Sequence, residues 1–379
     1  MGRAYLDHAS TSPARPEAVA GVLAWLTGPG AADPARVHTE GRMARAAVED
    51  ARERVATLLG ARPREVVFTS GATEAINAAT WGAAERRPDG AVVVAGVEHS
   101  AVRDAAARTS RLVLSPVDRL GRIDVTALLD RAGPGTALVH CQLANHEVAT
   151  LQPVAEVVAA CRHRGVLVHV DAAAAAGHVP VDFAALGADL LSVSAHKLGG
   201  PKGAGALLVR RGLRLAPLLV GGDQERARRA GMEDVPAIVG FGAACSALDL
   251  DTEAAAARTA TGRLLAGALA VPGVVAYGDA GHRLPHIVCV GVDGVEAEGV
   301  VLGLDQAGIA VHSGSACSSE ALEPSPVLEA MGVEAERSLR LSVGWNTTAA
   351  DVAAFLTAFP GVVGRLRALG HPGAGVPVD

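Results

Sequence analysis

The sequence predicts an α/β protein with a large domain built on a mostly parallel seven-stranded sheet and a smaller α+β domain at its C-terminal end. Seven short runs rich in Val and Leu alternate with longer helical segments, which is the order of elements in a parallel sheet. These runs are mostly apolar on both faces rather than alternating, as strands buried on both faces are. After about Leu250 the alternation gives way to an Ala-rich helix and isolated strand-like segments. A chain of 379 residues is also longer than one average domain.

The apolar runs define the expected strands of the large sheet, which are Val66–Thr69, Val92–Ala95, Leu112–Leu114, Ala137–Cys141, Val166–Val170, Leu190–Ser194 and Ala206–Val209. The expected helices include Arg42–Leu59, Ala101–Thr109, Val154–Arg164, Asp182–Leu186, Thr252–Ala268 and Ala349–Ala358, with a further strand at Ile287–Val292. We expect residues 13–250 to form the large domain, and residues 1–12 with 251–379 the small one. Ligands bind at the carboxyl ends of strands in open α/β sheets, so residues that follow a strand are the first candidates for a site.

Composition excludes several classes of protein. The net charge is −6, with both signs mixed along the chain and no basic block, so we expect no direct binding of nucleic acid. The N-terminus lacks the apolar core of a signal peptide, and no uncharged stretch approaches the roughly 18 residues of a membrane span. Five scattered cysteines without CxxC spacing argue against a disulfide framework or a metal site and for a cytoplasmic location.

The chain has almost no lysine. Its two lysines, Lys197 and Lys202, stand against 32 arginines. Arginine can replace lysine in salt bridges, but it cannot supply a neutral amine that forms a Schiff base with a carbonyl. Asp171 ends an apolar run 26 residues before Lys197. An acid that pairs with the pyridinium nitrogen and a lysine that holds the aldehyde are what pyridoxal phosphate requires. The alternative is an ordinary surface lysine and a turn aspartate.

The segment from Val66 to Asn77 reads as a strand, a tight turn and the start of a helix. Free N–H groups and the positive dipole end at a helix start bind phosphate, and Ser70 and Thr73 add hydroxyl donors. The alternative is a plain capping box with Glu74 in the first turn.

Other polar residues follow neighbouring strands. Glu98-His99 comes after the run that ends at Ala95, where an imidazole can stack on a flat cofactor and shuttle protons. Asn145-His146-Glu147 follows the next run, and Ser194 and His196 flank Lys197, within reach of a phosphate. Each of these residues alone is equally consistent with an ordinary loop position.

Cys317 lies in His312-Ser313-Gly314-Ser315-Ala316-Cys317-Ser318-Ser319-Glu320, a stretch of small polar residues that favours an exposed, nucleophilic thiol. Cys141 and Cys289 lie in apolar strands and are expected to be inert core thiols. Arg340, in a strand-like stretch, is suited to binding a substrate carboxylate through two parallel hydrogen bonds. A chance surface cysteine and a structural ion pair are the respective alternatives.

Together these segments resemble the NifS/IscS-type cysteine desulfurases, in the class V aminotransferase group of fold type I pyridoxal phosphate enzymes. The resemblance extends from Tyr5–Thr11 to Arg340–Gly344, and Ser-x-His-Lys at 194–197 and Ser-Gly-Ser-Ala-Cys at 313–317 are its most specific parts. The sequence after the cysteine, Leu322-Glu323-Pro324-Ser325, is similar to the longer loop of the IscS-like group rather than the shorter loop of SufS-like enzymes.

The resemblance implies a role for each matching residue. Lys197 carries the cofactor as a Schiff base and Asp171 pairs with the pyridinium. His99 stacks on the ring, and the phosphate is held by Ala72, Thr73, Ser194 and His196. Arg340 binds the carboxylate of L-cysteine with Asn145 nearby. Cys317 attacks the substrate sulfur, keeps it as a persulfide and releases alanine, with His312 or His99 lowering the pKa of the thiol. A homodimer and a sulfur-acceptor protein, such as an Fe–S scaffold or a thiolation enzyme, are also implied.

Two departures from the family pattern stand out. The glutamine expected three residues after the pyridinium acid is Ala174, and the threonine expected to reach the phosphate across a dimer interface is Met232. We expect pyridoxal phosphate to be retained but bound less tightly or with a shifted absorption spectrum, since each change removes a hydrogen bond. A second arginine often found near the C-terminal motif is Trp345 here. A C–S or selenocysteine lyase, an aminotransferase, and a non-catalytic scaffold that has lost its cofactor remain the alternative functions.

Overall fold

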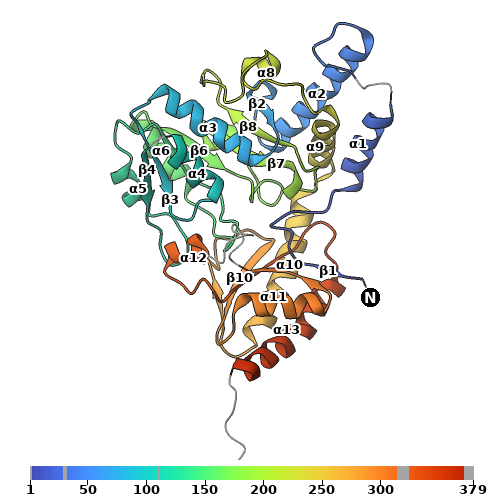
Figure 1. Ribbon diagram of the computed structural model, residues 1–379, viewed down its shortest axis with the longest axis vertical. Coiled ribbons are helices and arrows are strands. Elements are labelled where there is room, and N and C mark those ends of the chain that lie inside the picture. The colour runs from blue at the N-terminus through green and yellow to red at the C-terminus, as the bar shows by residue number, and fades with distance from the viewer. Residues whose placement is uncertain (1, 29–31, 110, 314–323, 371–379) are drawn as a thin grey trace, which may run out of the picture.

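A computed structural model describes residues 2–28, 32–109, 111–313 and 324–370 (Figure 1). Its large sheet has seven strands in the order β2 (Val66–Thr69), β8 (Gly205–Val209), β7 (Leu190–Ser194), β6 (Leu167–Asp171), β5 (Leu138–His140), β3 (Ala91–Ala95) and β4 (Arg111–Ser115). The β8 strand is antiparallel to both of its neighbours, and the other four pairs are parallel. The seven strands expected from the sequence are confirmed, because buried β-branched runs mark them clearly.

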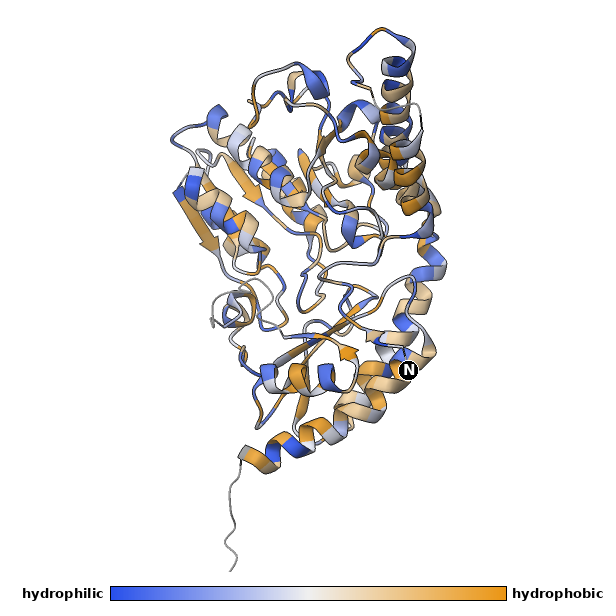
Figure 2. Cartoon of the chain, turned by 45° about the vertical axis from the view of Figure 1, so that its right-hand side comes forward, coloured by the Kyte–Doolittle hydropathy of each residue, from blue (hydrophilic) through white to orange (hydrophobic). Residues whose placement is uncertain are grey.

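Helices cover both faces of this sheet. On one face the core is formed with α3 (Ala72–Arg86) and α4 (Ser100–Thr109). On the other face it is formed with α2 (Thr39–Leu58), α5 (Val125–Arg131), α6 (Val154–His163) and α9 (Val235–Ala247), and α1 (Pro16–Thr27) packs outside α9. Short helical turns occur at η1 (Pro63–Glu65), α7 (Phe183–Leu186), η2 (Ala195–Lys197) and α8 (Gln224–Ala227). Figure 2 shows the strands as largely hydrophobic and many covering helices with both kinds of residue.

The C-terminal part has its own sheet and core. An antiparallel sheet contains β12 (His312–Ser313), β13 (Ser338–Ser342), β10 (Ile287–Val292) and β9 (Val274–Tyr277), while β1 (Ala4–Tyr5) pairs with β11 (Ile309–Ala310). The helices are α10 (Leu250–Leu269), α11 (Ala297–Gln306), α12 (Pro326–Met331) and α13 (Ala349–Gly370). Because the N-terminal strand shares this second core, we propose the domain boundaries at residues 12/13 and 250/251.

The helices depart from the expected ones for local reasons. The α2 helix begins before Arg42, because the His38 imidazole accepts a hydrogen bond from the Gly41 N–H and caps it. The α9 helix is apolar nearly all round, so it lacks the periodicity that marks an amphipathic helix. The α13 helix continues past Ala358 and through Pro360, a residue that ordinarily ends or kinks a helix.

One described helix, α13, is long and apolar enough to cross a membrane by length and composition, and the bent pair α9–α10 passes the same test. The sequence had indicated no such segment, since no uncharged stretch approaches the length of a membrane span. Phe355, Phe359 and Val363 of α13 are buried in the core of the small domain, as in the core helix of a globular domain.

Candidate active site

A cavity of about 520 Å³ lies at the carboxyl ends of β2, β6 and β7 and at the start of α3. This is where parallel sheets place ligands, and the volume is within the range of small-molecule sites. The predicted residues that line it are Ala72, Thr73, His99, Asp171, Ser194, His196, Lys197 and Arg340. Further lining residues include Ser10, Thr11, Ser70, Gln142, His146, Ala174 and Lys202. Eight positions from distant parts of the chain therefore meet at one site.

The start of α3 forms one end of the cavity. Ala72 and Thr73 belong to its first turn, whose N–H groups have no acceptor within the helix. The N–H of Ser70 is already used, because it donates to Glu74 Oε2 at 2.8 Å. A Cβ at Gly205 would lie 2.6 Å from the Cα of Gly71, so only glycine lets β8 approach this turn so closely. With its free N–H groups, this end of the cavity is suited to binding an anion.

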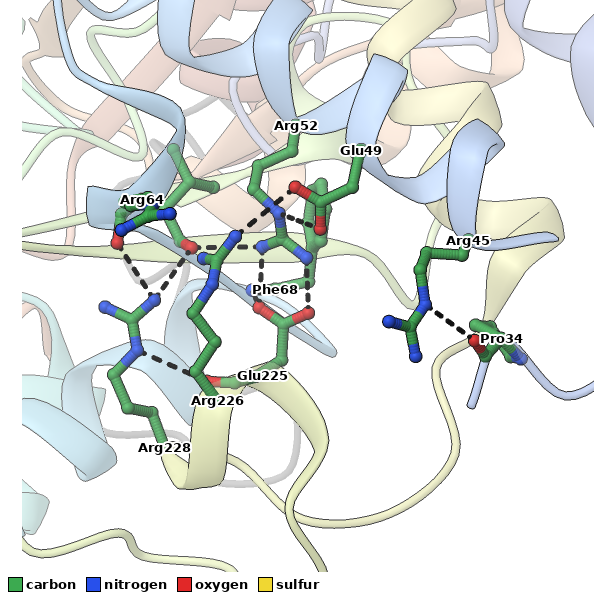
Figure 3. A network of polar contacts seen from close by, with 10 residues as sticks. Pro34, Arg45, Glu49, Arg52, Arg64, Phe68, Glu225, Arg226 and Arg228 are labelled. Carbon is green, nitrogen blue, oxygen red and sulfur yellow. Dashed lines mark hydrogen bonds and ion pairs between the residues drawn. The ribbon is translucent and has the colours of Figure 1, made fainter. Parts of the chain in front are cut away.

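Two arginine–glutamate pairs, neither found from the sequence, support this turn. Arg229 Nε lies 2.9 Å from Glu74 Oε1, and Glu74 holds Ser70. Deeper in the protein, Arg52 and Glu225 form two hydrogen bonds of 2.7 Å each, and Figure 3 shows this pair within a wider network. Glu225 Oε2 also accepts the N–H of Phe68, in the strand that leads into the turn, at 2.9 Å.

Asp171 and Lys197 lie at the carboxyl ends of two adjacent strands, β6 and β7. Asp171 is the last residue of β6, and Lys197 is in the η2 turn that follows β7. Oδ1 of Asp171 accepts hydrogen bonds from the Ser192 hydroxyl and the Ala173 N–H, both at 3.0 Å. Ser192 is two residues before Ser194 in the same strand, so it lies on the same face; that periodicity could have identified it.

His99 and His146 form a neutral imidazole pair beside the cavity. Their ring centroids lie 5.0 Å apart in an edge-to-face arrangement. Burial lowers the pKa of each ring to about 3, with the positive charge of Lys197 contributing. The Ala101 N–H donates to His99 Nδ1, so the proton of neutral His99 is on Nε2. His99 is therefore held as a neutral ring with a fixed tautomer.

Glu98, which sequence analysis gave no role, is fully buried next to this pair. Its Oε1 accepts the Gln142 N–H at 2.5 Å, and its Oε2 has no hydrogen-bond partner among the described residues. Burial, followed by the nearby charge of Asp171, raises the pKa of Glu98 to about 8. Glu98 is thus a protonated acid at neutral pH, placed behind the charged groups of the cavity.

Arg340 lines the cavity and also forms the ion pair that the sequence analysis gave as its alternative role. Its Nη2 lies 3.0 Å from Asp7 Oδ1 and 2.6 Å from Ser10 Oγ, and its Nη1 donates to the His146 carbonyl. Its buried Nε has no partner in the described part of the chain. The guanidinium is therefore held in place, with one donor still unused.

Asn145 is buried and lies behind the cavity wall. Its Oδ1 accepts the N–H groups of Glu147 and Val148, both at 2.8 Å, and its Nδ2 donates to the Val97 carbonyl. These contacts hold the loop after β5. The expected cofactor or substrate contact of Asn145 stays a prediction.

The remaining predicted positions differ in what the structure says of them. Ala174 lines the cavity, where its methyl group offers no hydrogen bond. Met232 is 68% exposed in the single chain. Cys317 lies outside the described residues. Cys141 and Cys289 are buried as expected, and burial raises the pKa of both thiols.

The donors and acceptors in the cavity fit pyridoxal phosphate. The α3 start with Thr73, Ser194 and His196 suits the phosphate, the amine of Lys197 suits the aldehyde, and the Asp171 carboxylate suits the ring nitrogen. The fit rests on the chemistry of these groups and on their meeting in one cavity.

Comparison with known proteins agrees with this geometry. The family model "Aminotransferase class-V" matches residues 4–355. The chain is 39% identical over 376 residues to "Cysteine desulfurase IscS 1" of Archaeoglobus fulgidus, covering 96% of this chain and 98% of that protein. It is 40% identical over 391 residues to "IscS-like cysteine desulfurase" of Mycobacterium tuberculosis, covering 98% and 99% of the two chains. A solved "NIFS-LIKE PROTEIN" superposes with a TM-score of 0.89 at 30% identity, covering 96% of this chain and 100% of that one.

Proposed function

The chain belongs to the aminotransferase class-V family, and from that membership we propose that it is a pyridoxal phosphate-dependent cysteine desulfurase. The observation that carries the proposal is the cavity itself. It brings Lys197, Asp171 and His99 together with the start of α3, so one site supplies an amine, a carboxylate, a flat imidazole and an anion-binding end. The substrate is L-cysteine and the carbon product is L-alanine.

When bound, pyridoxal phosphate withdraws electrons from the Cα of an amino acid. The residues of the chain do the rest. Asp171, oriented by Ser192 and Ala173, holds the proton of the ring nitrogen. Lys197 supplies the amine that holds the aldehyde and, once displaced, a base for the Cα proton. His99, a neutral imidazole with its proton on Nε2, would lie against the cofactor ring.

Sulfur transfer needs a nucleophile, and we assign that role to Cys317 from its sequence context. Its thiolate forms an S–S bond with the substrate sulfur while the Cβ–S bond breaks. The electron pair of that bond stays with the carbon, which takes up a proton and leaves as alanine. One L-cysteine and one enzyme thiol thus give one alanine and one persulfide, and no external oxidant is required. The persulfide then passes to an acceptor protein.

Three further proposals concern the oligomeric state, the cellular location and the residue that binds the substrate carboxylate. We propose a homodimer, because the exposed Met232 lies where the resembling enzymes place a residue at the partner's phosphate, and a cytoplasmic location, because the five cysteines are scattered and lack CxxC spacing. A monomer in light scattering would contradict the dimer. We also assign the substrate carboxylate to Arg340, whose guanidinium lines the cavity.

The test is to incubate the purified protein with pyridoxal phosphate, L-cysteine and a reductant, and to identify the carbon product. Alanine together with sulfide, both lost in Cys317→Ala, would establish desulfuration through a persulfide. Pyruvate with ammonia, unaffected by that substitution, would mean β-elimination, and the protein would then be a lyase. An apo protein that added pyridoxal phosphate fails to reconstitute would refute the assigned cofactor.

A further inference from the structure

Glu147 is a buried carboxyl group that the chemistry above does not use. It is 1% exposed and lies in the loop after β5, where its two carboxyl oxygens face His146 and Ser325. On one side its Oε1 is 3.5 Å from Nε2 of His146, which lines the cavity. On the other side its Oε2 is 2.6 Å from Oγ of Ser325. A buried carboxyl placed between a cavity residue and a distant segment of the chain calls for a specific reason.

Ser325 stands close to the cysteine-bearing segment in the sequence. It is eight residues after Cys317 and is the N-cap of α12, where its Oγ accepts the Leu328 N–H at 3.3 Å. The same hydroxyl donates its single proton to Oε2 of Glu147, so the carboxylate is the acceptor. Ser325 is itself only 1% exposed. The hydroxyl therefore fixes the start of α12 and ties it to Glu147 at the same time.

The other end of that segment also approaches Glu147. His312 is in β12 and pairs in register with Arg340 of β13, whose guanidinium donates to the His146 carbonyl. The charged or titratable groups that act on Glu147 are Arg340, His99 and His312, in addition to the adjacent His146. Burial raises the pKa of Glu147 to about 7, and the Ser325 hydrogen bond opposes that rise. The contact thus favours the ionised carboxylate.

Resting on the proposed function, we propose that Glu147 is a positioning residue that anchors the chain after Cys317 by accepting the hydrogen bond of Ser325. Glu147 lies beside His146, which lines the cavity, so the hydrogen bond holds Ser325 close to the cavity wall. The Cys317 thiolate must meet the substrate sulfur there, so the position of the chain that follows it affects the persulfide-forming step. Glu147 acts through Ser325 and does not itself touch the reacting atoms.

Two single variants and their double test the contact. In Ser325→Ala and in Glu147→Ala we expect the single-turnover rate of persulfide formation to fall by about tenfold, the size of a lost hydrogen bond to a charged group. The KM for L-cysteine and the cofactor absorbance should stay within about twofold, because the cavity residues are unchanged. The double variant should be no slower than Glu147→Ala alone, because both changes remove the same contact. Glu147→Gln, whose amide oxygen can still accept from Ser325, should recover most of the rate.

A second readout needs neither substrate nor turnover. The rate at which iodoacetamide alkylates Cys317, followed by mass spectrometry of its peptide, should change in Ser325→Ala and Glu147→Ala and return toward wild type in Glu147→Gln. Cys141, Cys161, Cys245 and Cys289 are buried, so they interfere little. The matched control is Glu329→Ala, an exposed position on the same short helix.

The outcomes separate cleanly. Wild-type persulfide and alkylation rates in both alanine variants would overturn the proposal, as would additive losses in the double variant. If Glu147→Ala fails to fold, Ser325→Ala and Glu147→Gln decide the question by the same two measurements. If the wild-type protein makes no alanine from cysteine, the proposed function fails, while the alkylation rates still show whether the Ser325–Glu147 contact positions the segment.

Discussion

Replacing Glu98 by glutamine should change how stability depends on pH. Glu98 is 1% exposed, and burial raises its pKa to about 8 from the ordinary 4.5. In the unfolded chain the group ionises at its ordinary value, so between pH 4.5 and 8 the folded protein holds a proton that the unfolded chain releases. The stabilising effect of that proton is fully present below pH 4.5 and is lost as the pH rises through 8.

The magnitude follows from the width of that interval. One pKa unit corresponds to about 1.4 kcal/mol, so the interval from 4.5 to about 8 corresponds to about 5 kcal/mol. Glu98→Gln cannot ionise. Its free energy of unfolding relative to wild type should therefore rise by about 1.4 kcal/mol for each pH unit between about pH 5 and 8, and level off above. The Oε2 of Glu98 has no hydrogen-bond partner among the described residues, so one polar atom of the new amide is also left without one. That lowers the free energy of unfolding by an amount that does not change with pH.

The assay is urea unfolding of both proteins, freed of cofactor, at unit steps from pH 5 to 9. Subtracting wild type from variant cancels the other titrating groups that the two proteins share. Glu85→Gln, an exposed position on α3, is the control for exchanging a carboxyl for an amide. A difference that stays flat from pH 5 to 9 would mean that Glu98 titrates alike in both states, and the reasoning from its burial would be wrong.

Three other substitutions have expected outcomes. Glu225→Ala should lower the free energy of unfolding by about 3 kcal/mol in urea titrations, because buried Arg52 loses two of its hydrogen bonds, keeping those to Val66 and Glu49, and the Phe68 N–H loses its side-chain acceptor; a loss below about 1 kcal/mol would contradict this. Ala174→Gln should tighten pyridoxal phosphate binding by about tenfold in an absorbance titration, by adding a hydrogen bond in the cavity, and unchanged affinity would count against that contact. Ala227→Gly should raise the free energy of unfolding by about 1 kcal/mol, since Ala227 has a φ of 59°; a destabilised variant would refute the strain.

The sequence predicted the sheet well because its strands are marked by composition alone. Runs such as Val92–Ala95 are apolar at every position, and that pattern requires cover on both faces. The α9 helix was missed because it too is apolar all round, which removes the 3.6-residue period. The seven-stranded order depends on pairing between distant residues, and β8 reverses direction between two neighbours for which local sequence gives no sign.

The site was predictable where its residues follow strands. Asp171 ends its strand and His99 follows one by four residues, so position at strand ends pointed to both, while Lys197 was indicated by the scarcity of lysine in the chain. The pair Arg52–Glu225 was not predictable, because its members are 173 residues apart and each alone is an ordinary surface type. Long-range contacts of this kind leave no periodic trace in the sequence.

The buried acids and imidazoles explain how Asp171 can act as the charged partner of a cofactor ring. His99 and His146 have pKa values of about 3 and are neutral at pH 7, and Glu98, with a pKa of about 8, is protonated there. An ionised Glu98 would add a second negative charge near Asp171, and a charged His99 or His146 would add a positive charge near it. Burial keeps Glu98, His99 and His146 uncharged at pH 7 by shifting their pKa values. The Asp171 carboxylate, whose Oδ1 is held by Ser192 and Ala173, is then the anion that we propose for the ring nitrogen of the cofactor.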